Sequence, residues 1–180
     1  RYWNCMGTGR GHTLFIETLW QDPAFFATWV AVIAFSICVH EFAHVMAATS
    51  QGDTTGLRGG YATLDPRRLM GVSSLISLAV FGIAWGAVPV NPARMRHRWS
   101  HAFVSASGPG ANLILAGIGA LALVLTRRFV PGNQALLLLF RCLLEGNCLL
   151  ALLNLMPIPM FDGWDIYTLV VPALKRISQE

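Results

Sequence analysis

The stretch that decides the fold is Val30 to Ala48, VAVIAFSICVHEFAHVMAA, an apolar run that contains an H-E-x-x-H pattern at His40, Glu41 and His44. Residues i and i+4 of a helix share a face, so both imidazoles can bind one metal ion, with Glu41 near enough to hold a water on it. Ionisable groups inside an apolar span cost roughly 2.5–3.5 kcal/mol each, so their presence favours a functional site. The alternative is a polar cluster that only holds helices together.

The composition is typical of a membrane protein. Of 180 residues, 54% are hydrophobic and 12% are charged, whereas soluble domains carry about 25% charged residues. The net charge is +4, and the arginines lie almost entirely between the apolar runs, as in membrane-protein flanks. This pattern gives no reason to expect a nucleic-acid partner. The four cysteines show no C-x-x-C spacing, which argues against a sulfur metal site.

The apolar runs predict an all-α, polytopic membrane protein with about four transmembrane helices and a short C-terminal helix. We expect the spans at 24–49, 69–88, 102–126 and 134–156. The glycine-rich sequence QGDTTGLRGGYATLDP at 51–66 predicts a small β-hairpin at the membrane edge. We therefore divide the chain into an interfacial segment (1–23), a single core (24–174) and a tail (175–180).

Two histidines leave a zinc site incomplete, because hydrolytic zinc takes three protein ligands and keeps a fourth position for water. Asp162 is the preferred third ligand. It follows a proline-broken segment after an apolar helix, and irregular backbone at membrane depth is tolerated only around a cavity or inside protein. Alternatively, Asp162 only caps the next helix. Asp165 is the second choice for the third ligand. The remaining acidic candidates are Glu145, Asp53 and Asp65.

Two separated motifs resemble the site-2 protease family of intramembrane zinc metalloproteases, in its minimal form without a PDZ or CBS domain. Residues 37–48 resemble its H-E-x-x-H helix, and NLMPIPMFDG at 154–163 resembles its N-x-x-P-x-P-x-x-D-G segment. Three further parts of the family pattern have a counterpart here, in the same order. They resemble Pro89-Val90-Asn91-Pro92, Gly108-Pro109-x-x-Asn112 and Asn147.

The resemblance implies a set of residue roles. His40, His44 and Asp162 would bind Zn²⁺, and Glu41 would act as general base. Asn154 would hold the substrate backbone near the metal, although an asparagine there also suits a helix-end cap. A glutamate third ligand, as in prenyl-protein processing, would instead implicate Glu145.

The function implied by the resemblance is regulated intramembrane proteolysis, in which a peptide bond in or near a transmembrane segment of a membrane protein is hydrolysed. The 51–66 hairpin would present the substrate strand by edge pairing. We expect a multi-pass protein of a bacterial or archaeal cell membrane. Its expected partners are the lipid bilayer and a substrate with a transmembrane helix. A homo-oligomer is compatible with the sequence. The alternative is a non-proteolytic metal-binding membrane protein or an inactive protease relative.

Overall fold

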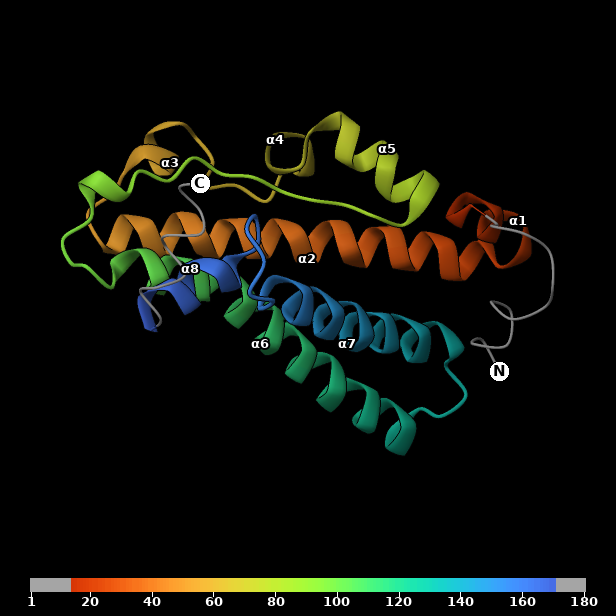
Figure 1. Cartoon of the computed structure of the whole chain (residues 1–180). Helices are drawn as coiled ribbons and strands as arrows, with labels where there is room; N and C mark the ends of the chain where they lie inside the picture. The colour runs from red at the N-terminus through yellow and green to blue at the C-terminus, as the bar shows by residue number, and fades with distance from the viewer. Residues whose placement is uncertain (1–13, 171–180) are drawn as a thin grey trace.

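The computed structural model describes residues 14–170 as helices, turns and one extended segment, with no β-strand among them (Figure 1). The prediction of an all-helical fold is therefore confirmed. Residues 1–13 of the predicted interfacial segment and the predicted tail lie outside the described residues.

Three described helices are long and apolar enough to cross a membrane: α2 (Pro23–Ser50), α6 (Ser100–Phe129) and α7 (Gln134–Asn154). The start of α2 is fixed by Asp22, whose side chain accepts a hydrogen bond from the Phe25 N–H at 2.9 Å. Among the described residues, two short helices precede α2: η2 (Phe15–Glu17) and α1 (Thr18–Gln21).

Helices α6 and α7 form an antiparallel pair because only a short loop joins them (Figure 1). They approach closely at Gly119, where a Cβ atom would lie 2.8 Å from the backbone nitrogen of Leu144. Their outer faces expose large apolar side chains, as expected of helices surrounded by lipid. These include Leu113, Ile114, Ile118, Leu121, Val124, Leu149 and Leu152.

The predicted span at 69–88 is wrong, because the chain folds back within it. Helix α4 (Pro66–Leu69) is followed by α5 (Gly71–Phe81), which has only 11 residues. Gly82 ends α5 with a left-handed φ of 74°, a conformation that glycine adopts without penalty. Residues 83–91 then return in extended conformation beside α2 (Figure 1). The Ser74 hydroxyl holds this turn closed, since it donates to the Trp85 carbonyl at 2.7 Å and accepts from the Trp85 N–H at 2.9 Å.

The predicted hairpin at 51–66 is also wrong. The segment forms turns and the short helix α3 (Thr55–Arg58). Its local structure follows from Asp53, which is fully buried and accepts hydrogen bonds from the Thr55 N–H and hydroxyl and from the Asn91 N–H. Burial raises the pKa of Asp53, but these hydrogen bonds, helped by the charge of Arg94, outweigh it and lower the pKa below the usual value. Asp53 thereby ties the end of α2 to the segment that leads into α6.

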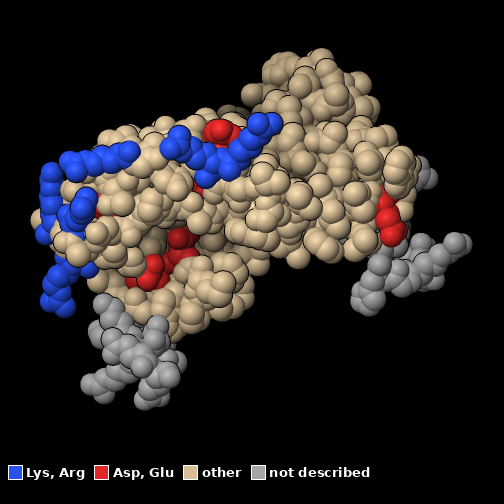
Figure 2. Space-filling model, turned by 90° about the horizontal axis from the view of Figure 1, so that it is seen from above, with Lys and Arg blue, Asp and Glu red and all other residues tan. Residues whose placement is uncertain are grey.

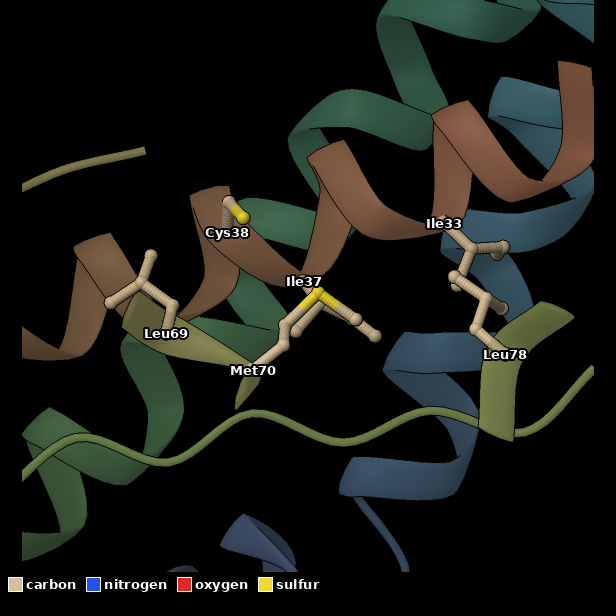
Figure 3. Close-up of a cluster of buried hydrophobic side chains, with 6 residues drawn as sticks. All are labelled: Ile33, Ile37, Cys38, Leu69, Met70 and Leu78. Carbon is tan, nitrogen blue, oxygen red and sulfur yellow. The ribbon is translucent and has the colours of Figure 1, made fainter. Parts of the chain in front are cut away.

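The main apolar core joins the fold-back to α2. Ile33, Ile37 and Cys38 from α2 meet Leu69, Met70 and Leu78 from the α4–α5 region (Figure 3). All six side chains are buried.

After η3 (Pro92–Arg94) the chain enters α6, and after α7 it reaches α8 (Asp162–Val170), which packs on α6. Helix α8 therefore lies beside the half of α2 that carries the H-E-x-x-H pattern (Figure 1).

Candidate metal centre

The structure brings His40, His44 and Asp162 together. His40 Nε2 lies 3.1 Å from Asp162 Oδ2, and His44 Nε2 lies 3.3 Å from Asp162 Oδ1. The two Nε2 atoms are 3.0 Å apart. Within the described residues, this is the group of three histidine, cysteine or acidic side chains whose ligand atoms converge closely enough to hold a metal ion.

Both histidine rings are fixed by hydrogen bonds from the ring atom that faces away from the cluster. His44 Nδ1 lies 2.8 Å from the Val104 carbonyl, which can only accept, so Nδ1 carries the proton. His40 Nδ1 lies 2.7 Å from Asn112 Oδ1. The Asn112 amide nitrogen donates to Asn147 Oδ1 at 2.9 Å, so its oxygen is the atom that faces His40. In a neutral ring each Nε2 atom therefore presents a lone pair to the cluster.

These three side chains fit zinc. Ligands held 2.0–2.1 Å from zinc at tetrahedral angles lie about 3.3 Å from one another, close to the separations found here. Asp162 Oδ2 is buried and accepts no hydrogen bond within the described part of the chain. A carboxylate oxygen and two nitrogen lone pairs that face one another without a proton between them repel, and a bound cation removes that repulsion. His40, His44 and Asp162 therefore suit Zn²⁺.

Glu41 is buried on the same helix, at the junction of α2 with the returning extended segment. A Cβ atom on Gly86 would lie 2.5 Å from Glu41 Oε1, so the segment passes directly over this carboxylate. Within the described residues, no hydrogen bond engages the Glu41 side chain. The carboxylate is therefore free to interact with a water or a substrate.

The other acidic candidates for the third ligand are engaged elsewhere. Asp165 contacts Ser105 and His101, and Glu145 accepts a hydrogen bond from Arg141 at 2.7 Å. Asp53 holds the α2–α3 turn, as described above. Asp65 caps α4, since its side chain accepts from the Arg67 N–H.

Asn154 is the last residue of α7, and its amide nitrogen donates to the Leu150 carbonyl at 2.9 Å. This bond reaches the carbonyl four residues earlier in the same helix, so it does not cap one of the last four carbonyls of α7. Its Oδ1 atom accepts no hydrogen bond within the described residues, so the predicted substrate role stays a prediction.

The contacts that support the centre could not be predicted from the sequence. The Val104 carbonyl and Gly86 belong to no motif, and a carbonyl partner leaves no signal in the residue type. Asn112 and Asn147 were singled out only through the family resemblance. In the structure they form a buried chain from His40 to the Ser36 hydroxyl, which Asn147 Nδ2 reaches at 2.9 Å. The chain joins α6 and α7 to the H-E-x-x-H helix.

The fold and the site together define a helical membrane protein with a centre suited to zinc. Three curated relatives carry names that agree with a zinc centre. A Bacillus subtilis protein named "Putative zinc metalloprotease YwhC" is 33% identical over 154 residues, which cover 82% of this chain and 70% of the relative. The chain therefore belongs to the same family as YwhC.

Two mycobacterial proteins named "Putative zinc metalloprotease Rip2" are also similar. The Mycobacterium tuberculosis protein (strain H37Rv) is 34% identical over 171 residues, which cover 88% of this chain and 63% of the relative. The Mycolicibacterium smegmatis protein is 34% identical over 153 residues, which cover 78% of this chain and 57% of the relative. The chain thus spans less than two thirds of the Rip2 proteins. No family model and no solved structure matches it.

Proposed function

We propose that this protein is a multi-pass intramembrane zinc metalloprotease of the site-2 protease family, which hydrolyses a peptide bond in or near a transmembrane segment of a membrane protein. The observation that carries the proposal is the convergence of His40, His44 and Asp162 beside Glu41, on a helix long and apolar enough to cross a membrane. The names of the relatives support the same chemistry.

The roles of the residues follow from their positions. His40, His44 and Asp162 would hold zinc, which polarises a water and the carbonyl of the scissile bond when it is bound. Glu41, which lacks a hydrogen-bond partner within the described residues, takes a proton from the attacking water and returns it to the leaving amine. The Val104 carbonyl and Asn112 hold the two rings in the tautomer that this arrangement needs.

The extended segment 83–91 supplies a place for the substrate strand, in place of the hairpin. The peptide groups of Trp85 and Ala87 turn toward α5 and α4, where they bond to Ser74 and to the Leu69 carbonyl. Successive peptide groups of an extended chain point in opposite directions. The groups of residues 84, 86 and 88 therefore form the opposite edge, and no described residue bonds to them. We infer that an unwound substrate segment pairs with this edge, next to Glu41.

The test compares wild type with Glu41→Gln in detergent, by zinc content and by cleavage of a model transmembrane substrate. We expect both proteins to bind about one zinc, as a single three-ligand site requires, and only wild type to cut. If both bind zinc and neither cuts any of several transmembrane substrates, a non-proteolytic metal-binding role replaces the proposal. If neither binds zinc, the centre itself is disproved.

A further inference from the structure

A surface cavity of about 470 Å³ lies next to the metal centre. Three segments enclose it: the loop before α6, the first turn of α6, and α8. Its lining includes Met95, Arg98, His101, Trp164, Asp165 and Thr168. None of these residues belongs to the centre described above.

The cavity and the metal centre share a wall. Asp165 follows Asp162 by about one turn of α8, and its Oδ2 atom accepts a hydrogen bond from the Ser105 hydroxyl at 3.1 Å. Ser105 is the neighbour of Val104, whose carbonyl holds His44. A turn of helix is about 5.4 Å long, and an extended chain covers about 3.3 Å per residue. A substrate chain at the metal centre therefore reaches the cavity within about two or three residues.

The loop that borders the cavity carries three exposed arginines, whereas Asp165 is the one acidic residue among the described residues of the cavity lining. Both oxygens of Asp165 are engaged, because Oδ1 lies 3.5 Å from His101 Nδ1 and Oδ2 bonds to Ser105. Arg98 is exposed and forms no ion pair or hydrogen bond with any described residue. Arg94 and Arg96, on the same loop, are exposed as well. Figure 2 shows basic side chains gathered toward one end of the molecule, and acidic side chains in a hollow near that end.

We propose that this cavity binds acidic residues that flank the transmembrane segment of the substrate, with Arg98 as their main cationic contact. The proposal rests on the proposed proteolytic function and names the substrates that the centre prefers: membrane proteins with glutamate or aspartate close to the cleaved bond. Arg98 disfavours a basic flank at the same place, because like charges across the cavity repel.

The test measures binding, so that it does not depend on cleavage. Three fluorescent transmembrane peptides, identical except for a flank of three Glu, three Gln or three Lys, are titrated with full-length Glu41→Gln protein in a nonionic detergent at low salt. We expect the Glu-flanked peptide to bind with a Kd about two- to fivefold lower than the Lys-flanked one, the size of effect that an exposed charge pair supplies. Adding Arg98→Glu should abolish or reverse this order.

The matched control is Arg128→Glu, which makes the same charge change at an exposed arginine at the other end of α6. It should leave the order of the three peptides unchanged. Equal Kd values for the three peptides, or a change with Arg98→Glu no larger than with Arg128→Glu, would overturn the proposal. A failure of the proteolytic function would show differently, as peptides that bind wild-type protein and are never cut.

Discussion

Gly108 lies against His40 so closely that a Cβ atom on the glycine would be 2.5 Å from the Nε2 atom of the ring. The same Cβ would be 2.5 Å from His44 Nε2. Heavy atoms do not approach to this distance without a bond, so the absence of a side chain at Gly108 keeps both ligand atoms accessible. The glycine makes room for a metal ion on the α6 side of the centre.

Replacing Gly108 by alanine should therefore displace both rings and remove zinc binding. We expect less than one tenth of the wild-type zinc content after a wash with a weak chelator, as when a ligand's orientation is lost. The control is Gly117→Ala on the same helix, where a Cβ atom would meet nothing within 4 Å. That variant should keep its zinc and gain about 0.5–1 kcal/mol of stability from the better helix former. Full zinc occupancy in Gly108→Ala would contradict the proposed position of the metal.

The hydrogen bond from His40 to Asn112 predicts a second effect on zinc. Asn112→Leu removes the acceptor that orients the ring and should weaken zinc binding about 10- to 100-fold in competition with a chelator. Asn112→Asp keeps an oxygen for His40 Nδ1 but loses the donor to Asn147, so it should bind zinc nearly as well as wild type while unfolding at a lower temperature. If both variants lose zinc equally, the asparagine acts on packing alone.

The free edge of segment 83–91 can be tested through the peptide group of Val88. Val88→Pro removes an N–H that no described residue uses and should raise KM for a transmembrane substrate about two- to tenfold, the value of one hydrogen bond. Val88→Ala removes more of the side chain but keeps the N–H, and should leave KM near the wild-type value. Steady-state cleavage in detergent gives both numbers. If Val88→Ala raised KM more than Val88→Pro did, residue 88 would act on the substrate through its side-chain packing and not through its N–H.

Asp53 should make stability fall at acid pH. Its pKa is lower in the folded than in the unfolded protein, so its contribution is fully present above the unfolded pKa, about 3.9, and is lost as pH falls through the folded pKa. Asp53→Asn should lower the unfolding temperature at neutral pH, because an amide cannot accept all three hydrogen bonds, and should flatten the acid limb. Thermal unfolding between neutral and acid pH measures both effects. Asp65→Asn is the control, since asparagine caps a helix as well as aspartate does.

The parts of the fold set by local periodicity were predictable, and the parts set by tertiary contacts were not. Apolar length alone located the three long helices, and the i, i+4 spacing placed His40 and His44 on one face. The run at 69–88 had the same apolarity, but Gly82 and the Ser74–Trp85 bonds fold it back, and hydropathy does not detect either. The 51–66 segment was expected to pair as strands because its glycines signal turns. The hydrogen bonds of Asp53 make those turns helical instead.

At the candidate site, the sequence provided the ligand types and the structure provided their convergence. The proline-rich segment before Asp162 argued for a position at a cavity, and the structure places the carboxylate against both histidines. The supporting contacts were beyond prediction, since they come from a main-chain carbonyl at Val104 and from the close passage of Gly86 over Glu41. Such contacts depend on how segments meet and leave no mark in the residue types.

The centre takes two ligands from α2 and its third from α8, the last helix described. During translation the histidines leave the ribosome long before Asp162 does, and a two-histidine half-site is a weak zinc ligand compared with the full set. The nascent chain therefore contains its first helices before the centre is complete. The full set of three side chains forms only once α8 has been synthesised and docked, so the hydrolysis that we propose starts only at that point.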